Sequence, residues 1–294
     1  MYSVEKLYRP QNLDEALEIL AGEGKNVWPL AGGTDVLVKM RRDKLKNVRL
    51  MSLAKIEALT GIGEDPDGSI TIGALTTFTG IAENPLIAKK VPMLKTAALS
   101  MGGPQIQNAA TIGGNICNGA TSADSAPGLF ALDAELELRS PGGTRILPVR
   151  EFYAGPGRVK KAADELLVRI ILRIGGMGIW AGEYIKMSTR NAMDISTLGA
   201  AALCELAPDG VVKKAAIALG TAGPTPLRCT AAEALLTGRR LTGLLLAKAG
   251  EAAKEAASPR SSWRASGEYR LALVEELSAR AFRRAFQACG GEIG

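Results

Sequence analysis

The apolar positions near the start of the chain follow first a helical and then an extended period. Residues 12–20 have the helical period, and their shared apolar face consists of Leu13, Ala16, Leu17 and Leu20. Asn12 and Glu15 have the spacing of a capping box, so we predict that a helix begins at this point. The next predicted elements are a strand, a helix and a strand, at 27–30, 36–40 and 48–53. This order predicts a small α/β unit at the N-terminus.

The middle of the chain alternates between predicted strands and short helices. Its strands are predicted at 69–73, 134–139, 144–149 and 166–174. Its helices are predicted from a cap at Thr76 or Thr77 to Ile81, and at 91–101 and 124–132. Because Pro141, Gly142 and Gly143 separate two of the strands, we expect those two strands to pair as a hairpin.

The last third of the chain begins with strands and ends with helices. Strands are predicted at 182–187, 197–206 and 211–219, as a β-meander with the turn Pro208-Asp209-Gly210. Helices follow at 231–236, where Thr230 is the expected cap, and at 241–257 and 268–289. Strands followed by helices are typical of an α+β region.

Two glycine pairs lie between these elements. The first is in the run Leu30-Ala31-Gly32-Gly33-Thr34-Asp35-Val36, where a strand is predicted to pass into a helix. The second is in Thr111-Ile112-Gly113-Gly114-Asn115, which opens a loop rich in small polar residues. Residues without a Cβ atom let the backbone turn sharply and approach a ligand, and N–H groups at a helix start lack partners. Such a turn suits a phosphate, although either pair alone is more often a plain turn.

A third glycine motif, Gly176-Met177-Gly178-Ile179-Trp180-Ala181, matches the G-x-G-x-x-A pattern of dinucleotide-binding sites and follows a predicted strand. A Rossmann site requires a helix after this turn and an acidic residue about twenty positions later. Residues 182–187 instead have the pattern of a strand, and no acidic residue ends a strand at that distance. We therefore expect a hairpin loop here rather than a nicotinamide-nucleotide site.

Composition narrows the classes of function. With 294 residues, of which 47% are hydrophobic, the chain is long enough for a large core and for two or three domains. The formal charge is +6, but Lys and Arg are scattered and aromatic residues make up only 4%, which argues against nucleic-acid binding. The modest positive charge suits an acidic partner subunit or an anionic cofactor, and equally an ordinary solvated surface.

The chain contains no histidine, and its four cysteines are far apart. The absence of histidine excludes Ser-His-Asp and Cys-His catalysis, His-ligated zinc and a histidyl-linked flavin within this chain. Cys117, Cys204, Cys229 and Cys289 have no metal-ligand spacing, so we expect neither a metal site nor an iron–sulfur cluster. A cysteinyl link to a cofactor through Cys117 stays open, but a small buried apolar residue is the more common role.

The N-terminus, MYSVEKLYRP, lacks the basic start and apolar core of a leader sequence. No apolar run approaches the roughly 18 residues that suggest a membrane-spanning helix. We therefore expect a cytoplasmic protein without a membrane span.

Taken together, the two glycine loops resemble those of the FAD-binding subunits and domains of the molybdenum hydroxylases, which include xanthine dehydrogenase and carbon monoxide dehydrogenase. The order and spacing match from Leu13 to about Gly220, in the segments Pro29 to Val36, Thr111 to Asn118 with Asp124, Glu165 to Leu167 and Tyr184 to Lys186. The resemblance implies an α+β fold, in which a two-lobed FAD-binding domain of the PCMH type precedes a C-terminal β-meander and helices. The implied division is a lobe at 1–56, a second lobe at 57–175 and a C-terminal domain at 176–294 that covers the flavin and contacts partners.

The resemblance also implies the cofactor and its contacts. We expect FAD without a covalent bond, its diphosphate held by N–H groups of the two loops, from Gly32, Gly33, Thr34, Gly113, Gly114 and Asn115. The other residues of the implied site are Pro29, Leu30, Ala31, Asp35, Val36, Thr111, Ile112, Asp124, Leu167 and Lys186.

The polar side chains of this implied site have alternative roles. Thr34 and Thr111 either donate hydroxyl hydrogen bonds to FAD or cap the helices that follow them. Asp35 is a poor phosphate ligand because of its charge, so it either binds a ribityl or ribose hydroxyl or caps the next helix. Asp124 accepts a flavin N–H or a sugar hydroxyl, or caps its helix. Lys186 balances the charge of phosphate or reduced flavin, or is an ordinary exposed lysine.

In this family, the flavin passes electrons between iron–sulfur centres and an outside acceptor. The resemblance therefore implies an oxidoreductase that works with an iron–sulfur subunit and a molybdopterin subunit, as a dimer of heterotrimers, and with an external acceptor such as NAD. The flavin performs the redox chemistry, so no residue of this chain is expected to be an acid–base catalyst. Two alternatives remain, a self-contained flavin reductase similar to the enolpyruvyl reductase of cell-wall synthesis and an assembly subunit without a cofactor.

The chain departs from some relatives in two places. Some have an aromatic residue where Met101 stands, and some have one in the segment that corresponds to 190–194. Neither aromatic residue is present here, so the sequence does not identify a side chain that stacks on the flavin ring.

Overall fold

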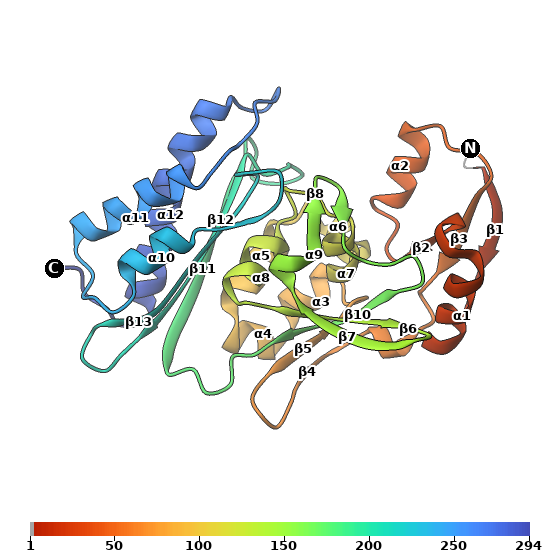
Figure 1. The fold of residues 1–294 in the computed structure, drawn as a ribbon, viewed down its shortest axis with the longest axis horizontal. Helices are drawn as coiled ribbons and strands as arrows, with labels where there is room; N and C mark the ends of the chain where they lie inside the picture. The colour runs from red at the N-terminus through yellow and green to blue at the C-terminus, as the bar shows by residue number, and fades with distance from the viewer. Residues whose placement is uncertain (1–2) are drawn as a thin grey trace.

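The computed structural model describes residues 3–294, whose strands form three larger sheets and one small strand pair. Figure 1 shows the three sheets in chain order, from the N-terminal lobe at the right to the C-terminal helices at the left. The mixed α+β class predicted from the sequence is confirmed.

The N-terminal sheet has three parallel strands in the order β1-β3-β2. Its elements are β1 (Val4–Tyr8), α1 (Leu13–Glu23), η1 (Gly24–Asn26), β2 (Val27–Leu30), α2 (Val36–Arg42) and β3 (Val48–Ser52), with η2 (Glu57–Leu59) after it. The predicted start of α1 is confirmed, because the Asn12 side chain accepts a hydrogen bond from the Glu15 N–H. The apolar pattern misses β1, whose side chains are mostly exposed at the sheet edge.

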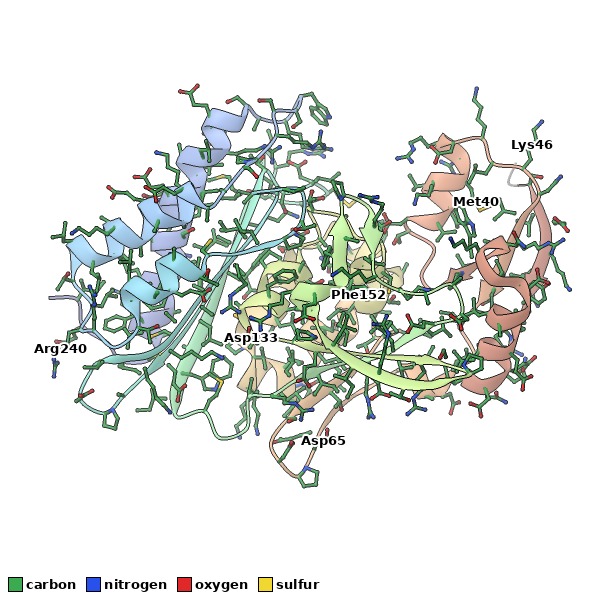
Figure 2. All side chains as sticks on the ribbon, viewed as in Figure 1. Met40, Lys46, Asp65, Asp133, Phe152 and Arg240 are labelled. Atoms are coloured by element: carbon green, nitrogen blue, oxygen red, sulfur yellow. The ribbon has the colours of Figure 1, made fainter. Side chains whose placement is uncertain are left out.

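The central sheet has five antiparallel strands in the order β4-β5-β10-β6-β7. The strands are β4 (Ile62–Glu64), β5 (Ile70–Gly73), β6 (Glu135–Ser140), β7 (Gly143–Pro148) and β10 (Leu166–Leu172). The predicted hairpin is therefore confirmed as β6–β7. In Figure 2, Asp65 marks the turn between β4 and β5, and Phe152, which is fully buried, lies within this central region.

Short helices connect the strands of the central region. They are α3 (Phe78–Glu83), α4 (Pro85–Lys90), α5 (Pro92–Ser100), α6 (Pro104–Ala109), α7 (Ile112–Cys117), α8 (Ser125–Ala131) and α9 (Val149–Phe152), followed by the strand pair β8 (Tyr153–Gly155) and β9 (Arg158–Val159). Thr77 caps α3 as predicted, since its hydroxyl accepts from the Gly80 N–H. The second glycine loop forms helix α7 itself, which the sequence pattern does not predict.

The C-terminal sheet is the predicted meander with one added short strand. Its strands are β11 (Ile179–Met187), β12 (Leu198–Leu206), β13 (Val212–Gly220) and β14 (Leu227–Arg228), and its helices are α10 (Thr230–Leu236), α11 (Gly243–Glu255) and α12 (Gly267–Ala288). In Figure 1 the three helices cover the outer face of this sheet, while α5 and α8 contact its inner face. The predicted cap Thr230 is wrong: Cys229 occupies the N-cap position and makes no side-chain capping bond.

The segment with the G-x-G-x-x-A pattern joins the central sheet to the C-terminal sheet. Gly176 to Gly178 lie between β10 and β11, and the rest of the motif begins β11. A strand rather than a helix follows the glycines, as predicted, and a Rossmann site requires a helix at this place. The expected hairpin is wrong, because β10 and β11 belong to different sheets and do not pair.

Candidate functional site

The two glycine loops line one cleft, which has a volume of about 630 Å³. One wall comes from the end of β2 and the start of α2, and the facing wall comes from α7 and the segment that leads to α8. Residues 193–195 contribute at one edge, and Leu53, Leu59 and Leu166 contribute apolar surface. The sequence placed these glycine pairs far apart, and the fold brings them together.

The first glycine loop offers a row of free backbone donors. The N–H groups of residues 32–36 donate to no acceptor among residues 3–294. Gly33 has a φ of 75°, which a residue with a Cβ atom rarely adopts. A Cβ atom on Gly32 would lie 1.6 Å from the Ala109 carbonyl oxygen at the end of α6. Glycine is therefore required at both positions, for backbone conformation at one and for close packing at the other.

The second glycine loop already uses its backbone donors within the fold. Gly113 donates to the Ala74 carbonyl at 2.9 Å, Gly114 to the Thr111 hydroxyl at 3.1 Å, and Asn115 to the Thr111 carbonyl at 2.9 Å. These three N–H groups therefore have acceptors within the fold, and their binding to a diphosphate stays a prediction. The alternative role of Thr111 as a cap is the one observed.

Close approach, rather than hydrogen bonding, explains the glycines of α7. A Cβ atom on Gly113 would lie 2.6 Å from Ala74. A Cβ atom on Gly114 would lie 2.9 Å from the Thr111 hydroxyl oxygen that caps the helix. Glycine at these two positions therefore permits the close packing of α7 against Ala74 and the cap by Thr111.

Most of the sequence-predicted site residues line the cleft, and three do not. Those that line it are Pro29, Ala31, Gly32, Gly33, Thr34, Asp35, Val36, Thr111, Gly113, Gly114, Asn115, Asp124 and Leu167. The exceptions are Leu30, Ile112 and Lys186. Ile112 is fully buried in the central core, and Leu30 packs against the core of the N-terminal lobe.

Asp35 and Asp124 are the two carboxylates of the cleft that the sequence singled out. Asp35 holds the N-cap position of α2, but its side chain makes no capping hydrogen bond, so the expected cap is wrong. Asp35 is exposed, and partial desolvation of its carboxylate raises the pKa of Asp35 despite the nearby Lys39. Asp124 likewise makes no capping bond.

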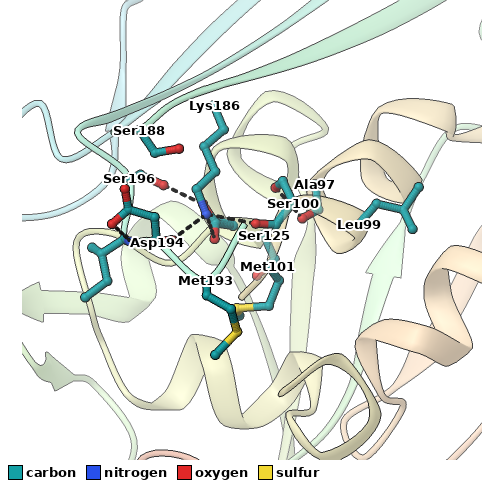
Figure 3. A network of polar contacts seen from close by, with 12 residues as sticks. Ala97, Leu99, Ser100, Met101, Ser125, Lys186, Ser188, Met193, Asp194 and Ser196 are labelled. Atoms are coloured by element: carbon teal, nitrogen blue, oxygen red, sulfur yellow. Dashed lines mark hydrogen bonds and ion pairs between the residues drawn. The ribbon is translucent and has the colours of Figure 1, made fainter. Parts of the chain in front are cut away.

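Asp124 is the centre of a buried polar network, part of which Figure 3 shows. Its Oδ1 atom accepts from Tyr184 Oη at 3.0 Å and from Ser196 Oγ at 2.5 Å, and its Oδ2 atom accepts from Lys186 Nζ at 2.9 Å. Burial, followed by the negative charge of Asp124, raises the pKa of Tyr184 well above its ordinary value. The carboxylate is thereby fixed in orientation at the wall of the cleft.

Lys186 contributes to the site from behind the wall. Its ammonium group also donates to the carbonyl oxygens of Ser100 at 2.8 Å and Asp194 at 2.9 Å, so all three of its protons have acceptors. The predicted lysine is therefore neither an exposed strand lysine nor a residue of the cleft surface. It joins β11, α5 and the 188–195 loop around Asp124.

Two methionines occupy the edge where some relatives have aromatic residues. Met101 and Met193 both line the cleft, and both are labelled in Figure 3. The Met193 N–H donates to the Gly102 carbonyl at 2.7 Å, and the side chain is half exposed. Thioethers make favourable contacts with aromatic rings, so this edge suits a planar ligand without an aromatic partner in the protein.

Sequence reasoning missed several residues of the cleft, and three of them are charged, namely Lys39, Lys161 and Asp194. Lys161 lies in the connection between β9 and β10, where no motif or periodicity marks it. Cys117, which the sequence treated as a possible apolar residue, also lines the cleft, and burial raises the pKa of its thiol to about 11. The only available signal for Lys161 is its position four residues before the matched segment Glu165 to Leu167.

Two family models match the chain in sequence. Residues 2–172 match the FAD binding domain in molybdopterin dehydrogenase, and residues 183–285 match the CO dehydrogenase flavoprotein C-terminal domain. The boundary between the two matches falls near the connection between β10 and β11. The matched regions together include both glycine loops and the Asp124 network.

Individual proteins are similar over the whole chain. The xanthine dehydrogenase FAD-binding subunit of Escherichia coli O157:H7 is 39% identical over 293 residues, which cover 100% of both chains. The carbon monoxide dehydrogenase medium chain of Hydrogenophaga pseudoflava is 28% identical and covers 96% of this chain and 97% of its own length. A solved carbon monoxide dehydrogenase structure from the same organism matches with a TM-score of 0.93, at 28% identity, over 98% of this chain and 99% of that one.

Proposed function

Because the chain belongs to the family of FAD-binding medium subunits of xanthine dehydrogenase and carbon monoxide dehydrogenase, we propose that it transfers electrons through FAD held in the cleft between its two glycine loops. The chain is accordingly an FAD-binding oxidoreductase subunit of the molybdenum hydroxylase type. The observation that carries the proposal is the convergence of the two loops on one cleft, with free N–H groups on the first.

The donors of the first loop fit the diphosphate of FAD. Five consecutive N–H groups, from Gly32 to Val36, have no acceptor within residues 3–294. Hydrogen bonds to ionised oxygens contribute about 1.5–3 kcal/mol each, so two or three of them outweigh the cost of about 1 kcal/mol for ordering a glycine. We assign diphosphate binding to this loop, because the N–H groups of Gly113, Gly114 and Asn115 in the second loop already have acceptors within the fold.

The remaining predicted residues have roles that follow from their positions. Asp35 accepts a ribose or ribityl hydroxyl, because its carboxylate lines the cleft and makes no capping hydrogen bond. Asp124 accepts a donor of the flavin or its sugar chain from the wall of the cleft, and Lys186 orients it from behind. Leu167 supplies apolar surface. The regions 1–56 and 57–175 hold FAD, and 176–294 closes the site through Lys186 and residues 193–195.

FAD, when bound, supplies the redox chemistry, because flavins exchange electrons either singly or in pairs. The chain positions the cofactor and excludes water from it, and no residue is assigned an acid–base role. We propose an iron–sulfur subunit and a molybdopterin subunit as partners, in a dimer of heterotrimers, and an external acceptor such as NAD. No helix within residues 3–294 is long and apolar enough to cross a membrane. We propose that the complex acts in the cytoplasm.

The proposal is tested by reconstituting the purified chain with FAD. We expect the absorbance bands of bound oxidised flavin after removal of free FAD. Gly33→Ala strains the left-handed backbone conformation of the loop by about 1–2 kcal/mol. If the free loop relieves this strain by leaving the conformation that binds FAD, FAD affinity falls by about five- to thirtyfold, and this is the result we expect. Gly22→Ala is the matched control, because a Cβ atom there meets nothing within 4 Å.

The outcome against the proposal is equally clear. A folded wild-type chain that retains no flavin after reconstitution does not use this cleft for FAD. Equal affinity of Gly33→Ala and wild type would exclude the first loop as the diphosphate site.

A further inference from the structure

Lys161 is a cation on the wall of the flavin cleft that none of the matched motifs includes. It lies in the connection between β9 and β10, close to Cys117 and Leu166, which line the same cleft. Its side chain is half-buried. The second lysine of the cleft, Lys39, is exposed, and its ammonium group lies 5.9 Å from the centre of the Trp28 ring. Lys161 is thus the more enclosed positive charge that the cleft offers to a ligand.

One N–H donor of the Lys161 ammonium group has no acceptor within residues 3–294. It donates to the carbonyl oxygens of Ala162 at 2.9 Å and Glu165 at 2.8 Å, and to no third acceptor within residues 3–294. No carboxylate within those residues forms an ion pair with it. Its charge is therefore not neutralised inside the protein.

The nearest carboxylate is already committed to another cation. Glu165 binds Arg145 through both oxygens, at 2.5 and 2.9 Å, and also accepts the Ala162 N–H at 2.7 Å. Arg145 additionally donates to the Lys160 carbonyl at 2.7 Å. These bonds fix the backbone on both sides of Lys161. The ammonium group is held in place before any ligand arrives, which lowers the entropy cost of binding.

Burial lowers the pKa of Lys161 from the ordinary lysine value, although Cys117, Glu165 and Asp164 favour the charged form. A desolvated cation without an ion-pair partner gains most from an anionic ligand, because such a ligand restores the lost stabilisation of the charge. The structure therefore places an incompletely satisfied cation where a nucleotide is proposed to bind.

The charge distribution of FAD indicates which part of the cofactor Lys161 contacts. The negative charge of FAD resides on the diphosphate, within its ADP half. The Asp124 wall already combines a carboxylate with its own fully bonded lysine, and so offers acceptors rather than positive charge. We propose that Lys161 binds the ADP half of FAD and thereby contributes to the affinity of the chain for FAD. This inference rests on the proposed function of the cleft.

The experiment compares the full-length wild type with Lys161→Met, Lys161→Arg and the control Lys160→Met. Lys160 is the exposed neighbour of Lys161, and its hydrogen bonds within residues 3–294 involve only its backbone, which accepts from Arg145 and donates to the Phe152 carbonyl. Titration calorimetry measures the dissociation constant of FAD, and competition with FAD measures the dissociation constant of ADP. One charge-assisted hydrogen bond corresponds to about tenfold in affinity. We expect Lys161→Met to lose about tenfold for FAD and for ADP alike, Lys161→Arg to retain part of the affinity, and Lys160→Met to stay within about twofold.

A second readout separates ligand contact from a structural role. The charged form of Lys161 binds the anion, and its pKa in the free protein is lowered. The affinity for ADP should therefore fall as pH rises through that lowered pKa, and this dependence should be absent in Lys161→Met. The thermal midpoints of the variants without ligand verify that they are folded.

Each result decides the inference. The inference is overturned if Lys161→Met binds FAD as tightly as the wild type. It is also overturned if the variant loses affinity for FAD but not for ADP, or if ADP at millimolar concentration does not compete with FAD. The first two results leave the FAD site intact and contradict only the role of Lys161. A folded wild type that binds no FAD contradicts the proposed function itself.

Discussion

At the scale of single residues, the Asp124–Lys186 pair shows how the site depends on a buried charge. Both side chains are less than 10% exposed, and the carboxylate accepts three hydrogen bonds. Removing one member of a buried pair leaves the other charge without compensation, which costs about 3–5 kcal/mol. We expect Lys186→Met to lower the free energy of unfolding by this amount, measured by urea denaturation without FAD.

An exposed ion pair between α11 and α12 provides the matched control. Lys254 binds Glu275 at 2.7 Å, and both side chains are more than 40% exposed. Water compensates both charges, so Lys254→Met should cost no more than about 1 kcal/mol. A similar small loss for Lys186→Met would show that the Asp124 carboxylate is not held by its lysine.

Single residues also show how much of the site could be predicted from the sequence. Glycine and small polar residues mark the cleft because their backbone requirements are local, and Gly32, Gly33 and Gly114 were predicted for that reason. The use of each donor is not local. The N–H of Gly113 bonds to Ala74, which lies on another segment, and Lys161 becomes a cleft residue only through the path of the β9–β10 connection.

At the scale of elements, the two long C-terminal helices pack so closely that one contact excludes a side chain. A Cβ atom on Gly250 of α11 would lie 2.7 Å from the Glu275 carbonyl oxygen of α12. Gly250→Ala must push the helices apart, and overpacking of this kind costs about 1–3 kcal/mol. We expect the midpoint temperature of thermal unfolding to be lower for Gly250→Ala than for the wild type.

The control for this contact lies in the same helix. A Cβ atom on Gly243, at the start of α11, meets nothing within 4 Å. Gly243→Ala should leave the midpoint unchanged or raise it slightly, because alanine favours the helix over glycine. If Gly250→Ala behaves like Gly243→Ala, the two helices do not touch at this position.

The elements that the sequence predicted are those long enough to show a period. Strands β12 and β13 and helices α11 and α12 were predicted close to their observed bounds. The short helices α4, α6 and α7 were not, since one or two turns contain too few apolar positions to define a face. The strand β1 was missed because it lies at an edge and exposes most of its side chains.

At the scale of the whole molecule, single strands join neighbouring cores. Strand β10 contributes Leu166 and Val168 to the N-terminal core and Leu167 and Ile170 to the central core. Strand β12 joins the central and C-terminal cores in the same way. Its residues 201 and 203 belong to the central core, and residues 200, 202 and 204 belong to the C-terminal core. Side chains on a strand alternate between its two faces, so each of these strands belongs to two cores at once.

Shared strands predict that the chain unfolds as one unit, although it matches two family models. A region that melts alone would expose one face of β10 or β12, together with the apolar residues that the neighbouring core needs. We expect a single calorimetric transition whose enthalpy equals the van't Hoff enthalpy. All three regions contribute residues to the cleft, so bound FAD should raise the midpoint temperature of this single transition. At a free FAD concentration of one hundred times its dissociation constant, the folded state should be stabilised by about 2.7 kcal/mol. Two separate transitions, of which FAD shifts only the first, would mean that the C-terminal sheet neither shares the central core nor closes the cleft.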